Sequence, residues 1–126
     1  MENDPDHRPL IWMGSSKRDL MDMPEDVVSD FGFGLYQAQI GKFPDIGKTL
    51  SGFGNADVVE LKLECEGDAF RAVYTIQFSE FVVVLHAFQK KSMKGKETPK
   101  KDKELIESRL KAAVQMYKEF KAERKK

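Results

Sequence analysis

Residues 58–88 read VVELKLECEGDAFRAVYTIQFSEFVVVLHAF, and this stretch sets the architecture of the chain. Apolar and polar residues alternate through most of it, which is typical of β-strands with one buried face. Short turn sequences around Gly67 and Ser79 interrupt the alternation. The stretch therefore predicts an antiparallel meander of three strands, over residues 58–65, 69–78 and 81–88.

Tight turns in this meander place Glu66 opposite Ala69 and Phe78 opposite Phe81, and alternation then sorts every side chain onto one of two faces. The apolar face, which we expect helices to cover, takes Leu61, Leu63, Cys65, Phe70, Ala72, Tyr74, Ile76, Phe78, Phe81, Val83, Leu85 and Ala87. The second face takes Glu60, Lys62, Glu64, Arg71, Val73, Thr75, Gln77, Val82, Val84, His86 and Phe88.

A further strand and two helices are predicted before the meander. The apolar segment 9–13 favours a strand, and a short helix is expected over 17–21. A second helix is predicted over 24–40, and the Gly- and Pro-rich segment 42–56 is expected to be a loop. The apolar residues with helical spacing in the second helix are Val27, Phe31, Leu35 and Ala38.

A long helix is predicted after the meander. Thr98 and Pro99 suit its first positions, and an apolar stripe follows at Ile106, Leu110, Ala113, Tyr117 and Phe120. We expect one domain over 9–120, a disordered leader over 1–8 and a frayed tail over 121–126.

Composition excludes several classes of protein. Apolar residues make up 40% of the chain, charged residues 33%, and no apolar run is long enough to span a membrane. The N-terminus lacks the apolar segment of a signal peptide, so we expect a cytoplasmic protein. The single cysteine, Cys65, excludes an internal disulfide and a cysteine-cluster zinc site.

Charge is distributed unevenly although the net charge is zero. Residues 86–126 carry fourteen Lys and Arg against six Asp and Glu, and the preceding residues carry the opposite excess. A basic surface for an anionic partner would explain this asymmetry. A helix and tail made lysine-rich for solubility would explain it equally well.

The second face of the meander gathers cationic and aromatic side chains. The expected register puts Lys62 and His86 on one row, and Glu64, Arg71 and Phe88 on the next. Because strands lie ~4.8 Å apart, the cations would share a patch about 10 Å across. Such a patch can bind and act on a phosphodiester, with the aromatic ring as a stacking surface for a base.

Structural roles remain open for the same residues. Arg71 opposite Glu64 can be an ordinary exposed ion pair, which stabilises a protein little. His86 can be a half-buried residue without chemistry, and Lys62 can belong to an alternation of solvated charges.

The order of short motifs carries a family resemblance. The segments VVELK (58–62), FRAVY (70–74) and VVLHAFQKK (83–91), followed by Thr98-Pro99 before a helix, resemble the phage-derived HigB-like branch of the RelE/HigB toxins. That resemblance implies the toxin of a type II toxin–antitoxin system. It also implies an α+β, RelE-like fold: a small three-to-four-stranded antiparallel sheet, two N-terminal helices and one C-terminal helix.

The resemblance also implies an activity, which is ribosome-dependent cleavage of mRNA by an endoribonuclease (mRNA interferase). In that reaction the ribose 2′-hydroxyl attacks the adjacent phosphate, without a metal or other cofactor. Arg71 matches the family's phosphate-stabilising arginine, and His86 and Lys62 complete the expected catalytic set. The residues expected to bind RNA are Phe88, Lys90, Lys91 and Lys94. Which of His86, Lys62, Lys90 and Lys91 acts as base or acid stays open.

The partners implied are mRNA on the ribosome and a cognate antitoxin with a helix-turn-helix domain, encoded by a neighbouring gene. An alternative belongs to another class. In it the chain is a non-enzymatic toxin of the same fold that poisons DNA gyrase, or an inactive homologue that only binds antitoxin.

Overall fold

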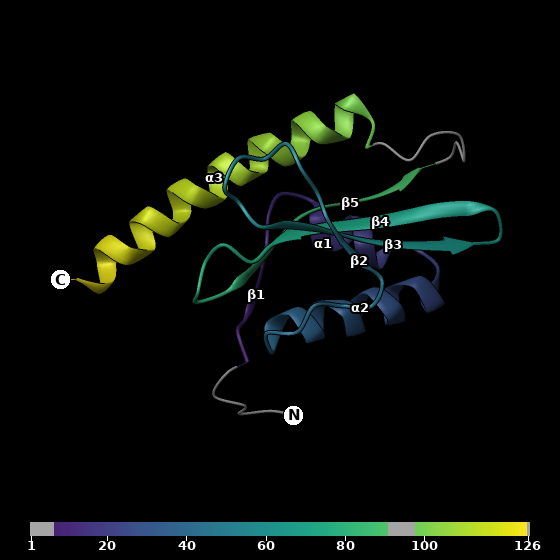
Figure 1. Cartoon of the computed structure of the whole chain (residues 1–126), viewed down its shortest axis with the longest axis horizontal. Helices are drawn as coiled ribbons and strands as arrows, with labels where there is room; N and C mark the ends of the chain where they lie inside the picture. The colour runs from purple at the N-terminus through teal and green to yellow at the C-terminus, as the bar shows by residue number, and fades with distance from the viewer. Residues whose placement is uncertain (1–6, 91–97, 126) are drawn as a thin grey trace.

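The computed structural model describes residues 7–90 and 98–125, which form an α+β fold (Figure 1). The elements in chain order are β1 (Leu10–Trp12), α1 (Ser16–Met21), α2 (Glu25–Gln39), β2 (Gly47–Thr49), β3 (Val58–Cys65), β4 (Asp68–Thr75), β5 (Val82–Lys90) and α3 (Lys100–Arg124). The predicted helices and strands are all present, and the fold is consistent with the RelE-like architecture expected from the sequence.

The sheet has five strands in the order β1-β5-β4-β3-β2, rather than three or four. It is mixed, because β1 pairs with β5 in parallel while every other pair is antiparallel. The strand missed by the sequence analysis is β2, which lies inside the segment expected to be a loop. It is only three residues long and begins at Gly47, so alternation could not mark it.

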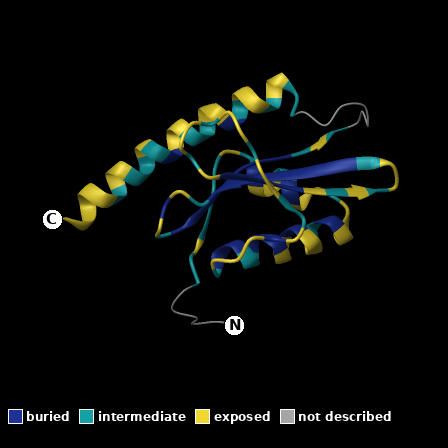
Figure 2. Ribbon diagram, viewed as in Figure 1, coloured by how far each residue is buried: buried dark blue, intermediate teal, exposed yellow. Residues whose placement is uncertain are grey.

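Helices cover both faces of the sheet, with α2 on one side and α3 on the other (Figure 1). Figure 2 shows the centre of the sheet buried between them and the β3–β4 turn exposed. The α2 face packs as predicted, because the four apolar residues of the second helix are all buried: Val27, Phe31, Leu35 and Ala38.

The opposite face packs against α3. The predicted apolar stripe of this helix lies entirely in the second core cluster, together with Val58, Val73 and Leu85 of the sheet. The second face of the meander is therefore not an open polar surface. This covering helix changes the environment of every candidate site residue.

The first hairpin turns one residue earlier than expected on each of its two strands, so the pairing of β3 with β4 is shifted by two positions in all. Cys65 pairs with Asp68, so Glu66 and Gly67 form the two-residue turn. Both turn residues have positive φ, 50° and 86°, as a type I′ turn requires. The resulting shift of two positions preserves the faces, and Tyr74 and Cys65 both pack on the helix-covered α2 side as predicted.

The second hairpin contains a β-bulge and a wide connection. Val73 pairs with His86 but Tyr74 pairs with Val84, so Leu85 is an extra residue in β5. The faces predicted for residues 82–85 are therefore wrong, since Val82 and Val84 pack on the α2 side and Val83 and Leu85 on the α3 side.

The connection itself holds two more residues whose predicted face is wrong. Phe78 and Phe81 join the α3 cluster, and their rings contact that of Tyr117. Both residues lie in the connection between β4 and β5, where strand alternation no longer determines which face a side chain takes.

Both ends of the described chain make ordered structure. Arg8, placed in the expected leader, donates hydrogen bonds to the carbonyls of Ala38 and Phe78. Helix α3 continues to Arg124, inside the tail expected to fray. None of the helices in the described part of the chain combines the length and the apolarity needed to cross a bilayer.

Candidate functional site

The strand register brings the predicted cations closer together than expected. Lys62 pairs with Arg71, and Arg71 pairs with Phe88, so these three residues share one row across β3, β4 and β5. His86 lies on the neighbouring row. The expected Glu64–Arg71 pair is wrong, because Glu64 pairs with Ala69 in the shifted hairpin.

Arg71 is buried rather than exposed. Only 1% of the residue is accessible, and its Nη1 donates a hydrogen bond to Oε2 of Glu60 over 3.2 Å. Glu60 is itself 3% exposed. Burying two charges carries a desolvation penalty of several kcal/mol per ion, which the pair offsets only when its hydrogen bonding is good.

The hydrogen bonding of this ion pair is incomplete. The buried Nε of Arg71 has no hydrogen-bond partner among the described residues. On the carboxylate side, the hydroxyl of Thr98 donates to the same Oε2 of Glu60 over 3.4 Å. Buried guanidinium nitrogens usually have an acceptor, so this Nε has room for one more hydrogen bond.

His86 is held between two side chains of α3. Its Nε2 lies 2.8 Å from Oδ1 of Asp102, and its Nδ1 lies 3.4 Å from Nη1 of Arg109. An arginine can only donate, so we assign Nδ1 as the acceptor and Nε2–H as the donor to Asp102. Both ring nitrogens are then engaged, and the ring stacks on Phe88 with centroids 4.7 Å apart.

The remaining predicted residues differ in exposure. The side chain of Lys62 is exposed, whereas Phe88 and Lys90 are half-buried near the end of β5. Lys91 and Lys94 lie outside the described residues. Lys62 is therefore the predicted catalytic residue most accessible to a substrate.

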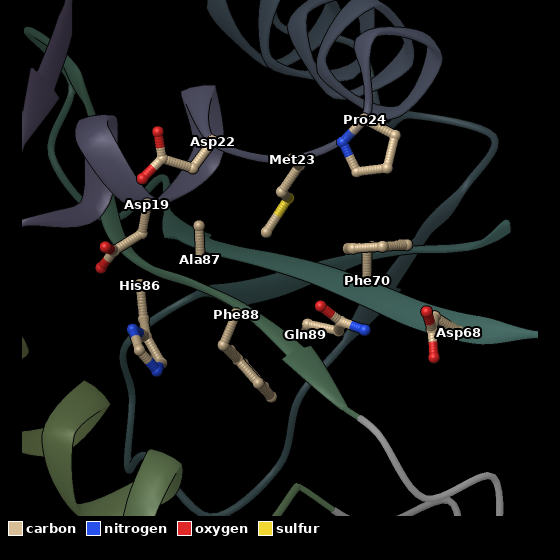
Figure 3. Close-up of a pocket in the computed structure, with 10 residues that line it drawn as sticks. All are labelled: Asp19, Asp22, Met23, Pro24, Asp68, Phe70, His86, Ala87, Phe88 and Gln89. Carbon is tan, nitrogen blue, oxygen red and sulfur yellow. The ribbon is translucent and has the colours of Figure 1, made fainter.

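An open pocket of about 540 Å³ lies along β5, and His86 and Phe88 are among the residues that line it (Figure 3). Asp19 of α1, Asp22 directly after α1 and Asp68 of β4 contribute carboxylates to it. Three carboxylates repel phosphate groups. This acidic pocket is therefore not the place where an RNA backbone would bind.

The sequence analysis missed three residues that surround the predicted set: Thr98, Asp102 and Arg109. The apolar stripe of the C-terminal helix could have identified two of these residues, Asp102 and Arg109. Asp102 stands four residues before Ile106 and Arg109 three after it, so both lie on the sheet-facing side of α3. No comparable pattern marked Thr98, whose contact with Glu60 depends on tertiary structure.

Together the fold and the site define a small α+β protein that carries a cationic cluster on a helix-covered sheet face. Residues 18–111 match the family described as phage derived protein Gp49-like (DUF891), and the chain belongs to that family. This is a family of RelE/HigB-type toxin-like proteins. No curated protein matches the chain.

Proposed function

We propose that this protein is the toxin of a toxin–antitoxin pair, of the HigB-like branch, and that it cleaves mRNA on the ribosome. The observation that carries the proposal is the buried Arg71, which lies beside Lys62 and whose Nε has no hydrogen-bond partner within residues 7–90 and 98–125. Packing does not require a buried cation, because apolar residues of similar volume stabilise a core as well or better. Membership of a family of toxin-like proteins supports the same conclusion.

The proposed reaction is an internal phosphoryl transfer. The 2′-oxygen bonds to the adjacent phosphorus, the bond from phosphorus to the 5′-oxygen breaks, and a cyclic phosphate and a 5′-hydroxyl result. One proton leaves the 2′-hydroxyl for a base, and one reaches the 5′-oxygen from an acid. Arg71 would stabilise the charge on the phosphate with its forked donors, and Lys62 would add a second positive charge.

Arg71 must change partners to do this. Its guanidinium is 1% exposed and bonded to Glu60, so a phosphate has to replace that carboxylate or displace it. Because Thr98 holds the same oxygen of Glu60 and precedes α3, binding of RNA would be coupled to the start of that helix.

His86 receives a positioning role in the proposal. Both ring nitrogens are engaged by Asp102 and Arg109, so His86 would have to release one of these hydrogen bonds before it exchanged a proton with a 2′-hydroxyl or a leaving oxygen. In the proposal, proton transfer therefore falls first to Lys62, which lies beside Arg71 and is exposed.

The proposed partners are ribosome-bound mRNA and a cognate helix-turn-helix antitoxin, with the cytoplasm as the site of action. A second candidate is a non-enzymatic binding toxin or an inactive antitoxin-binding homologue. It is favoured by one observation, that both Arg71 and His86 are tied to carboxylates, Glu60 and Asp102, rather than open to substrate.

Induced expression in bacteria, followed by mapping of transcript 5′ ends, tests the proposal. Parental protein should produce new 5′ ends within translated messages, and folded Arg71→Ala should cut about 10²–10³ times more slowly. Arg71→Lys should recover activity only in part, because an ammonium lacks the forked donors. Arg18→Ala removes an exposed arginine from α1 and is the matched control, expected to cleave at the parental rate.

Two outcomes contradict the proposal. One is cleavage at the parental rate by Arg71→Ala or Arg71→Lys protein whose thermal melt shows a folded state. The other is growth arrest without new transcript ends, accompanied by inhibition of gyrase in a supercoiling assay, which would establish the non-enzymatic alternative.

A further inference from the structure

A second pocket, on the α3 side of the sheet, has the opposite character to the acidic one. It has a volume of about 600 Å³ and lies between β2, the segment after it and the start of α3. Its lining residues are Lys48, Thr49, Leu50, Ser51, Phe53, Thr98, Lys100 and Lys103. We name it the basic pocket, because its lining holds three lysines and three hydroxyl groups and, among the described residues, no carboxylate.

The lysines of the basic pocket are not neutralised. Lys48, Lys100 and Lys103 are exposed, and within residues 7–90 and 98–125 none of them forms an ion pair. By contrast Arg71 and Lys121 each have a carboxylate partner. Three ammonium groups without a carboxylate partner in the described part of the chain surround one hollow, and their positive potential attracts an anion.

The basic pocket borders the Arg71 centre. Lys48 pairs with Glu60 in the β2–β3 ladder, and Thr98 donates its hydroxyl proton to Oε2 of Glu60. That oxygen is the one bonded to Arg71. A polyanion seated in the basic pocket can therefore continue toward Arg71 and Lys62 without crossing the acidic pocket.

We propose that the basic pocket binds the backbone of single-stranded RNA beside the phosphate that is cleaved. The three lysines would contact successive phosphates, the hydroxyls would bond to phosphate or ribose oxygens, and Phe53 would stack on a base. The RNA assignment rests on the function proposed above. Phe53 favours RNA over an acidic peptide, because an aromatic ring in the lining adds a stacking surface that a run of carboxylates cannot use.

Fluorescence anisotropy with a short single-stranded RNA carrying 2′-O-methyl groups throughout measures binding without cleavage. Lys48→Ala combined with Lys103→Ala is compared with Lys111→Ala combined with Lys118→Ala. The control pair removes the same charge from an exposed part of α3 that lines a different hollow. Affinity is recorded between 0.05 and 0.5 M salt.

The basic-pocket variant should lose about 1.4 from the slope of log affinity against log salt, since each single-strand phosphate contact contributes about 0.7. If the two affinities are equal at 1 M salt, a slope lower by 1.4 means an affinity about 25-fold weaker at 0.1 M salt. The control variant should keep the parental slope. Replacing Phe53 with Leu should weaken binding while leaving the slope unchanged, because stacking releases no counterions.

Parental affinity and slope in the Lys48 and Lys103 variant would overturn the inference. So would a polyglutamate peptide that binds in a lysine-dependent manner while the RNA does not, since the pocket would then take an acidic protein segment. The probe cannot be cleaved, so the two proposals fail separately. Lysine-dependent RNA binding by a chain that produces no transcript ends supports the inference and contradicts the nuclease.

Discussion

The two faces of the sheet bury different chemistry. On the α2 face the buried strand residues are apolar or aromatic, and Phe70, Tyr74 and Val84 are representative. On the α3 face Glu60, Arg71 and His86 are buried among apolar neighbours. The first face needs only close packing to stabilise the fold. The second keeps charged groups in a low-dielectric setting, where they are costly to bury and where a phosphate would be bound strongly.

The largest expected effect comes from breaking the ion pair on the α3 face. Arg71→Ala leaves the buried carboxylate of Glu60 with the Thr98 hydroxyl as its one side-chain partner among the described residues, and should lower the free energy of unfolding by about 3–5 kcal/mol. Combining Glu60→Gln with Arg71→Met removes both charges and should restore most of that loss. Urea denaturation at neutral pH measures both. A loss below about 1 kcal/mol for the single variant would show that solvent screens the pair.

A cavity on the α2 face should cost stability without touching function. Leu35→Ala should lower the free energy of unfolding by about 2–5 kcal/mol, because Leu35 is 2% exposed and packed in the core. Phe33→Ala on the same helix removes a side chain that is 61% exposed, and should change stability by less than about 0.5 kcal/mol. The folded fraction of each should bind RNA with parental affinity. Weaker binding by folded Leu35→Ala would mean that the two faces are coupled.

The contrast between the faces also separates what the sequence predicts from what it does not. Alternation placed Tyr74 and Cys65 on the α2 side even though the first hairpin is shifted, because a shift of two positions returns each side chain to the same face. The bulge at Leu85 inserts a single residue, and no feature of a run of apolar side chains marks it. The faces of residues 82–85 were therefore predicted wrongly.

Burial of the candidate site was not predictable from strand pattern. The wrong register paired Arg71 with Glu64 in the prediction. Only the three-dimensional structure shows that α3 covers Arg71 and that its ion-pair partner is Glu60. The sequence placed Glu60, Arg71 and His86 on one face correctly. It did not predict their partners: Asp102, which bonds to His86, and Thr98, which bonds to Glu60, both come from a distant segment. Partners across such sequence separations depend on packing, which periodicity does not encode.

A smaller effect tests how the start of α3 is anchored to this face. Asp102→Ala should lower the free energy of unfolding by about 1–2 kcal/mol, since it leaves the Nε2–H of His86 without its acceptor. Asp102→Asn keeps an oxygen in place and should lie close to the parental protein, because the hydrogen bond needs an acceptor and not a charge. Thermal melts of the two variants compare them. An equal loss in both would mean that the charge of Asp102, and not only its hydrogen bond, stabilises this end of α3.

The smallest effect concerns the other end of α3, where Glu80 is bonded to three side chains. The hydroxyl of Tyr117 donates to Oε1 over 2.6 Å, and Ser79 and Lys121 donate over 2.9 and 3.3 Å. These bonds, that of Tyr117 foremost, lower the pKa of Glu80 from 4.5 to about 2. Because the folded-state pKa lies below the unfolded one, the contribution to stability is complete above about pH 4.5. It is lost as the pH falls toward 2.

Tyr117→Phe removes the strongest of these bonds, so it should raise the pKa of Glu80 and flatten the acid limb of the stability curve. The difference in urea midpoint between this variant and the parental protein should be greatest near pH 6 and should shrink steadily toward pH 2. Tyr36→Phe, a change of the same kind on the α2 helix, is the control and should shift the curve by the same amount at every pH. Side-chain carbon chemical shifts of Glu80, followed through an NMR titration, report the pKa directly. A midpoint near 4.5 in the parental protein would show that these hydrogen bonds contribute little, and that the contacts of Tyr117 with Phe78, Phe81 and Phe120 matter more for the end of α3.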